Sequence, residues 1–257
     1  MNRRGQHPEP PDPGCRPVVH LLRHGETVGY RTDTGLTVLG RRQALAAGRR
    51  LAGRLVAGDR VRIVHSPRAR TRETALLLGE GIGAVADVDE PVEEPGFDNF
   101  RVRMEDDELE VTVAFERFAG ARPHDGGGGR VPGWVAEADR FWRIHESGGD
   151  PIAHWLTQPM QHIEPAAAVV RRMWSTIVRT AADARTAGVD HLVICGHSGP
   201  IRAIAAQALG VDPGEPDHLE ELELLLDPDG SRAQLRFRGQ TIDIDVPVAV
   251  APSWFRS

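Results

Sequence analysis

Two histidines follow short apolar runs that end in glycine-containing polar segments. Residues 18–22 (Val-Val-His-Leu-Leu) lead into Arg23, His24 and Gly25, and residues 191–195 (His-Leu-Val-Ile-Cys) lead into Gly196 and His197. A neutral imidazole can attack phosphorus, while cationic side chains hold the phosphoryl oxygens. The pattern therefore indicates phosphoryl transfer, with His24 as the candidate nucleophile and Arg23 beside it in a phosphate clamp.

A third cation follows another apolar run, residues 61–65 (Val-Arg-Ile-Val-His). Ser66 and Pro67 then predict a helix with Ser66 as N-cap and Pro67 at the first helical position. Arg70 would lie one turn into this helix and point back at the strand edge that carries His24. His197, if protonated, would complete the clamp, and backbone amides before the following helix could assist it.

Strands and helices alternate around these residues. We expect strands at 17–22, 61–65, 84–89 and 191–195, helices from Thr37 to about 55, after Ser66, at 164–187 and at 200–209, and a hairpin of 219–226 with 233–238. The alternation predicts a partly parallel, helix-covered α/β sheet with an antiparallel edge. Ligands bind at the carboxyl ends of strands in such sheets, so His24 and His197 are expected to meet there.

The chain is expected to form one domain over residues 17–257, after a proline-rich disordered leader at 1–16. Residues of about 95–162 change in character and predict an insertion over the core, with short helices near 104–119 and 133–146. A run of four glycines, 126–129, favours a loop within it. The insertion's aromatic residues are expected to form its own small core, and one of them could line the substrate pocket. These are Trp134, Phe141, Trp142 and Trp155.

Composition excludes several classes of protein. A net charge of -6 over 257 residues disfavours a general nucleic-acid binder. The chain contains no lysine, which excludes a Walker-type phosphate loop and a Schiff-base lysine. Cys15 and Cys195 suggest neither a disulfide framework nor a zinc site. Because neither a signal peptide nor a membrane-spanning run is evident, we expect a soluble cytoplasmic protein with no membrane partner.

Four segments together resemble the histidine phosphatase superfamily, which includes cofactor-dependent phosphoglycerate mutases and many small-molecule phosphatases. They appear in the family order and are residues 22–27 (Leu-Arg-His-Gly-Glu-Thr), 36–44 (Leu-Thr-Val-Leu-Gly-Arg-Arg-Gln-Ala), 66–75 (Ser-Pro-Arg-Ala-Arg-Thr-Arg-Glu-Thr-Ala) and 196–202 (Gly-His-Ser-Gly-Pro-Ile-Arg). The resemblance implies a three-layer α/β/α phosphoglycerate mutase-like fold with a mostly parallel central sheet, an antiparallel edge and a helical cap insertion.

The resemblance also implies roles for single residues. His24 would be the phosphorylated nucleophile, and Arg23, Arg70 and His197 would bind the phosphoryl group. Thr37 stands where the family often has a hydroxyl near that pocket. The family's proton donor is usually the acid of a Leu-x-Glu pattern. Alignment on Val92 makes Glu94 that donor, with Glu93 as the alternative.

The sequence departs from the family's pattern at two places. Tyr30 replaces an asparagine frequent six residues after the nucleophile, and Pro-Gly-Phe-Asp at 95–98 replaces the mutase continuation. We therefore expect hydrolysis of a small-molecule phosphomonoester (a sugar, polyol or metabolite phosphate), with a mutase-type isomerase and a non-catalytic phospho-ligand binder as alternatives. The resemblance implies metal-free chemistry without a cofactor. A homodimer is frequent in the family, and the sequence leaves the oligomeric state open.

Three further histidines could serve as metal ligands: His145, His154 and His162. Their spacing fits no compact metal-binding motif, and His145-Glu146 does not continue to a second histidine at the step that a helical zinc motif requires. The sequence therefore predicts no metal site.

Overall fold

An eight-stranded mixed sheet forms the centre of the protein, as the computed structural model shows for residues 16–29, 32–121 and 131–247. The sheet order is β10-β9-β8-β1-β7-β2-β3, with β4 also paired to β2. The strands are β1 (Val18–Arg23), β2 (Arg60–His65), β3 (Asp87–Val88), β4 (Val92–Glu93), β7 (His191–Gly196), β8 (Glu221–Leu226), β9 (Arg232–Phe237) and β10 (Gln240–Asp245). Strands β1, β7, β2, β3 and β4 are parallel, whereas β8, β9 and β10 form the antiparallel edge.

The register of the parallel strands aligns their carboxyl ends. Leu22 of β1 and His65 of β2 both pair with Cys195 of β7, and Arg23 pairs with Gly196. Most residues of these central strands are buried, as expected for strands covered by helices on both faces. The residues that follow them, including His24, Ser66 and His197, therefore emerge at one edge of the sheet.

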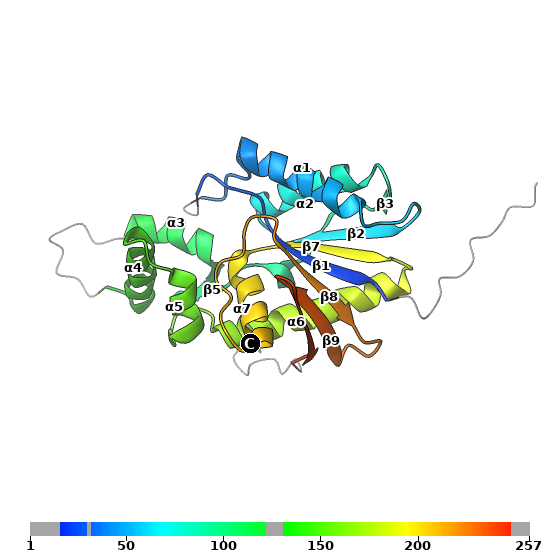
Figure 1. Cartoon of the computed structure of the whole chain (residues 1–257). Coiled ribbons are helices and arrows are strands. Elements are labelled where there is room, and N and C mark those ends of the chain that lie inside the picture. Colours follow the sequence, from blue (N-terminus) through cyan, green and yellow to red (C-terminus); the bar gives the residue numbers. More distant parts are fainter. Residues whose placement is uncertain (1–15, 30–31, 122–130, 248–257) are drawn as a thin grey trace, which may run out of the picture.

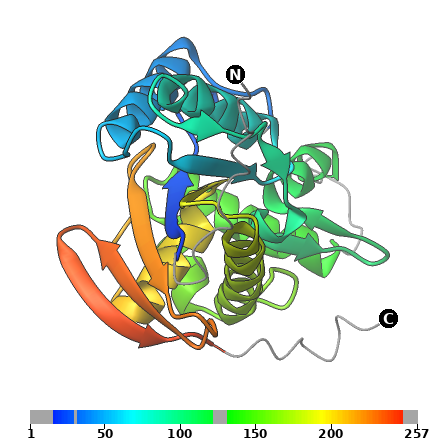
Figure 2. The same ribbon diagram turned by 90° about the vertical axis from the view of Figure 1, so that its right-hand side faces the viewer.

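Helices cover both faces of the sheet (Figures 1 and 2). Helices α1 (Val38–Ala52) and α2 (Ala69–Ile82) cover one face, where Leu51, Leu78 and Ile82 are buried with Ile63 of β2. Helices α6 (Ala166–Thr186) and α7 (Ser198–Leu209) cover the other, and Trp174 of α6 is fully buried there. The three-layer α/β/α fold with an antiparallel edge is thus confirmed.

Local boundaries differ from the sequence-based expectations in several places. Thr37 caps α1 as predicted, by accepting a hydrogen bond from Gly40 N. Ser66 does not cap α2, which begins at Ala69; its first amides donate instead to the carboxylate of Asp33. The prediction of a Ser66 cap was wrong because the Ser66 hydroxyl is used by His197. Strands β4 and β10 were not predicted, nor was the helix at Pro151–Thr157.

The segment near 95–162 lies beyond the end of β1, on the left in Figure 1. It consists of η1 (Pro95–Phe97), the hairpin of β5 (Arg101–Arg103) and β6 (Glu108–Glu110), α3 (Val111–Ala121), α4 (Gly133–Glu146) and α5 (Pro151–Thr157). Residues 104–110, expected to begin a helix, contain β6 instead. Cys15, Tyr30, the glycines at 126–129 and almost all of the expected leader lie outside the described residues. In the part of the chain that is described, no helix is long and apolar enough to cross a membrane.

Candidate active site

His24 and His197 lie side by side at the ends of β1 and β7. Both rings are buried, and their centroids are 5.6 Å apart in an edge-on arrangement. His24 Nδ1 is 2.7 Å from the carbonyl oxygen of Gly25. Because a carbonyl only accepts, Nδ1 carries the proton and the ring lone pair is on Nε2. His24 therefore presents the tautomer that a nucleophilic Nε2 requires.

Two glycines allow the loop after His24 to pack against α1. A Cβ on Gly25 would lie 2.7 Å from the carbonyl oxygen of Gly40, and a Cβ on Gly40 would overlap the carbonyl oxygen of Glu26. The backbone approach that holds His24 thus needs glycine at both positions. Thr74 supports the same loop, since its hydroxyl accepts a hydrogen bond from Gly25 N at 3.1 Å.

His197 is held between two groups contributed by the segment after β2. Its Nδ1 is 3.2 Å from the guanidinium nitrogen Nη2 of Arg70, and its Nε2 is 2.7 Å from Ser66 Oγ. Since a guanidinium only donates, Nδ1 is the acceptor and Nε2–H donates to the serine. Asp98 lies farther from the ring, at 3.8 Å, and forms an ion pair with Arg68.

The two arginines of the clamp are also buried and partnered. Arg70 is 1% exposed and contacts Asp33 at 3.2 Å and Glu110 at 3.4 Å. Arg23 donates to the carbonyl oxygen of Pro216 at 2.5 Å and pairs with Glu215 at 3.2 Å. The structure thus brings together Arg23, His24, Arg70 and His197, as the sequence predicted.

The electrostatics of the site favour neutral imidazoles and an added anion. Burial lowers the pKa of His24 and of His197 well below the ordinary value, and the positive charge of Arg70 lowers both further. His197 is accordingly neutral in this site, where the clamp was expected to use a protonated ring. The buried Nε of Arg70 and Nε2 of His218 make no hydrogen bond with any described residue. A phosphate dianion would supply acceptors here and favour protonation of an imidazole.

Glu94 is not in contact with these four residues. Its carboxylate accepts a hydrogen bond from Gly96 N at 2.9 Å and pairs with Arg179 of α6 at 2.5 Å. Glu93 is exposed. Thr37 is occupied by Gly40 N and by Glu26 Oε2, at 2.9 and 3.2 Å, rather than by a clamp residue.

Sequence reasoning missed two residues that the structure places at the site. Glu110 is 4% exposed, and its carboxylate contacts both Arg70 and the Thr112 hydroxyl. Burial raises the pKa of Glu110 although Arg70 opposes the shift. The His218 ring lies 6.0 Å from that of His24, in the loop before β8. No local pattern marks either residue, because both reach the site only through tertiary folding of the cap and of the β8 loop.

A separate group of potential metal ligands lies on β1 and β8. His20, Glu221 and Glu223 place ligand atoms within 4.8 Å of one another. Arg54 already pairs with Glu221 at 2.6 Å and lies 3.6 Å from Glu223. Arg236 pairs with Glu223 at 2.9 Å, so within the described residues two arginines balance the two carboxylates and the group is an ion-pair cluster.

Comparison with known proteins places this site in a family. A family model described as histidine phosphatase superfamily (branch 1) matches residues 19–132 and 133–242. A curated relative named "Putative phosphoserine phosphatase 2", from Hydrogenobacter thermophilus, is 23% identical over 201 residues, covering 75% of this chain and 79% of the relative.

Solved structures show the same fold. A mycobacterial glucosyl-3-phosphoglycerate phosphatase is 22% identical, with a TM-score of 0.52 over 87% of this chain and 97% of that one. A phosphoglycerate mutase from Bacillus anthracis is 16% identical, with a TM-score of 0.53 over 91% and 94%. Because the family model spans most of the chain and includes both histidine segments, the chain belongs to the histidine phosphatase superfamily, and its phosphatase-named relative supports a phosphatase.

Proposed function

We propose that this protein is a phosphatase that hydrolyses a small-molecule phosphomonoester through a phosphohistidine on His24. The observation that carries the proposal is the buried pairing of His24 with His197, with Arg70 against His197 and the positive charges of Arg70 and Arg23 near His24. A nucleophile with its lone pair on Nε2 faces a set of donors suited to phosphoryl oxygens. A protein that only binds phosphate would need the donors but not the nucleophile.

In the first step, His24 Nε2 forms a bond to phosphorus while the bond from phosphorus to the ester oxygen breaks. Arg23, Arg70 and His197 bind the non-bridging oxygens, whose negative charge they stabilise. The Gly25 carbonyl stabilises the ring by accepting from Nδ1–H as positive charge develops. In the second step, a water oxygen attacks phosphorus, the bond to Nε2 breaks, and inorganic phosphate leaves.

The leaving alkoxide needs a proton, and we assign its delivery to Glu110 rather than to Glu94. The Glu110 carboxyl is buried beside Arg70, and burial raises its pKa, as a general acid requires. The phosphate dianion would raise that pKa further. Glu94 pairs instead with Arg179 on α6. After the first step, Glu110 is a carboxylate that can accept a proton from the attacking water.

The test uses a labelled ester and a histidine variant. Wild-type protein mixed rapidly with a phosphate-labelled aryl ester should trap label that is lost in acid and retained in base, as a phosphoramidate requires. His24→Asn should release no phosphate and trap no label. His154→Asn, on α5 and outside the site, is the matched control, and it should release phosphate and trap label like the wild-type protein. Undiminished turnover by His24→Asn would refute the nucleophile, and phosphate moving between substrate hydroxyls without release would favour the mutase alternative.

A further inference from the structure

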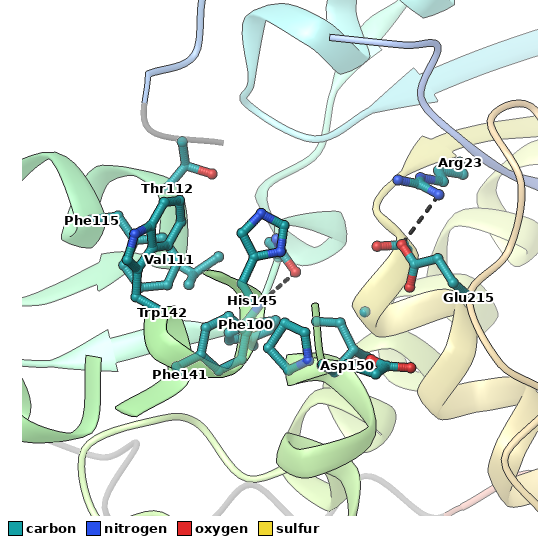
Figure 3. Close-up of a pocket in the computed structure, with 16 residues that line it drawn as sticks. Arg23, Phe100, Val111, Thr112, Phe115, Phe141, Trp142, His145, Asp150 and Glu215 are labelled. Atoms are coloured by element: carbon teal, nitrogen blue, oxygen red, sulfur yellow. Dashed lines mark hydrogen bonds and ion pairs between the residues drawn. The ribbon is translucent and has the colours of Figure 1, made fainter. Parts of the chain in front are cut away.

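A cavity of about 340 Å³ opens beside the clamp and extends under the cap (Figure 3). Its volume is typical of a small-molecule site. Arg23 and Ser198 line its end near the clamp, and Thr112, which accepts from Arg70 at 3.2 Å, lies on its wall. A phosphate bound by Arg23 and Arg70 would therefore carry its ester group into this cavity.

The wall contributed by the cap, the segment near 95–162, is apolar and largely aromatic. It is formed by Phe100, Val111, Phe115, Phe141, Trp142 and Ile152. Figure 3 shows most of these side chains grouped opposite the pair of Arg23 and Glu215. The rings are packed on one another: Phe115 lies 5.6 Å from Phe141 and 5.3 Å from Trp142 between centroids. Such packing holds the wall in place before a ligand enters.

Most polar side chains that line the cavity already have protein partners. Asp150 caps α5 and pairs with Arg202, while Glu215 pairs with Arg23. Asn99 accepts from the amide of Phe100. A polyol or sugar buried against this wall would lose hydrogen bonds to water without replacing them, at a cost in affinity.

The charges of the cavity also disfavour a second anionic group on the substrate. Asp150 and Glu215 are carboxylates, and Arg23 is the one arginine among the described lining residues. Arg23 is committed to Glu215 in this structure and to phosphate in the proposed reaction. A carboxylate or second phosphate on the substrate would meet these two carboxylates, and His145, which packs on Trp142 at 5.3 Å between ring centroids, is the one other described lining side chain that can carry a positive charge.

We propose that the substrate is a phosphomonoester of a large, uncharged, apolar or aromatic alcohol, an inference that rests on the proposed phosphatase activity. The phosphate binds at the clamp, and the apolar group fills the cavity against Phe115 and Trp142. This choice differs from the sugar and polyol phosphates that the sequence left open. The apolar group also excludes water from the reacting phosphorus.

The test compares esters of primary alcohols, so that the leaving oxygen stays chemically similar. We expect kcat/KM for 2-naphthylmethyl phosphate to exceed that for ethyl phosphate, glycerol phosphate and O-phosphoserine by about 100-fold, a ratio within reach of apolar burial in a preformed pocket. Trp142→Ala should lower the ratio of kcat/KM for the naphthylmethyl ester to kcat/KM for ethyl phosphate about 10-fold, a loss of the size typical for an apolar contact. Trp134→Ala, on the same helix but outside the cavity, should leave the ratio of kcat/KM for these two esters unchanged. Because that ratio does not depend on the folded fraction, a destabilised variant remains informative.

Two outcomes separate this inference from the phosphatase assignment. Hydrolysis that favours glycerol phosphate or O-phosphoserine over the naphthylmethyl ester would overturn the apolar substrate and retain the phosphatase. If no ester is hydrolysed, the phosphatase assignment fails. Calorimetric titration of His24→Asn with each ester then measures which ester the cavity binds more tightly. Tighter binding of the naphthylmethyl ester than of ethyl phosphate supports the apolar cavity, whereas equal binding refutes it.

Discussion

Replacement of Glu110 by glutamine tests the proton donor most directly. Glu110 Oε2 accepts from the amides of Thr112 at 2.9 Å and Val113 at 3.4 Å, which caps α3. Glutamine keeps an amide oxygen for this cap and loses the charge, worth about 0.3–1 kcal/mol at a helix N-terminus. Its NH2 group also replaces Oε1, which accepts from Arg70 and from the Thr112 hydroxyl, but Arg70 keeps its ion pair with Asp33. The variant should therefore stay folded while it loses the only proton that this carboxyl could deliver.

The size of the catalytic loss should depend on the leaving group. For an alkyl phosphate, whose alkoxide needs protonation, Glu110→Gln should lower kcat by about 10²–10³, in the range of general acid catalysis. For 4-nitrophenyl phosphate, whose phenolate leaves without a proton, the first step should change by less than about threefold. KM should not rise, because the change removes a carboxylate that competes with phosphate for Arg70.

Steady-state assays with both esters provide the measurement, and the pre-steady-state burst of released alcohol or 4-nitrophenol isolates the first step. Glu94→Gln is the matched control, since it removes a carboxylate that pairs with a half-exposed arginine, Arg179, and it should cost at most about 1 kcal/mol of stability. An equal loss on both esters in Glu110→Gln would show a positioning role instead of proton donation. A loss confined to Glu94→Gln would refute the assignment and restore the donor expected from the sequence.

Three further changes test the packing and charge of the site. Gly40→Ala should destabilise the fold and lower activity, because the Cβ of the alanine would overlap the carbonyl oxygen of Glu26. Thermal unfolding and phosphate-release assays measure the two effects, and an unaltered melting temperature would contradict the prediction. Arg202→Met should lower the free energy of unfolding by about 3 kcal/mol in urea titrations, the lower end for breaking a buried pair, because this 2%-exposed side chain bridges two partly exposed carboxylates at 2.7 Å each. A loss below about 1 kcal/mol, on the order of a surface ion pair, would show that the bridge is dispensable. Burial holds the pKa of His24 and His197 low in the folded state. The unfolded chain therefore binds protons first as pH falls below about 6.5, and the stability of the fold should decrease below that pH. Urea midpoints that stay constant from pH 7.5 to 5 would refute this.

Regular elements were predicted where one pattern dominates the local sequence. The apolar runs before His24 and His197 became β1 and β7, and the turn at Asp227–Ser231 joins β8 to β9 as expected. Strand β10 was missed because its apolar residues alternate with acidic ones, as at Asp243 and Asp245, and such a segment resembles a solvent-exposed loop. It becomes a strand only by pairing with β9. Helix α2 began later than predicted because Ser66 bonds His197, a partner 131 residues away.

The amino-acid sequence alone pointed to the residues that we propose for the chemistry at phosphorus. His24 and His197 each follow an apolar strand, and strand register then places them together, so short-range pattern and sheet geometry suffice. Tertiary packing, in contrast, brings Glu110 to Arg70 beside Asp33 and sets what surrounds the ester group. Glu110 and the aromatic wall of Phe115 and Trp142 come from the cap, whose position over the sheet edge depends on packing between segments far apart in sequence. Burial, which raises the pKa of Glu110 and lowers that of His24, exists only once that packing has formed.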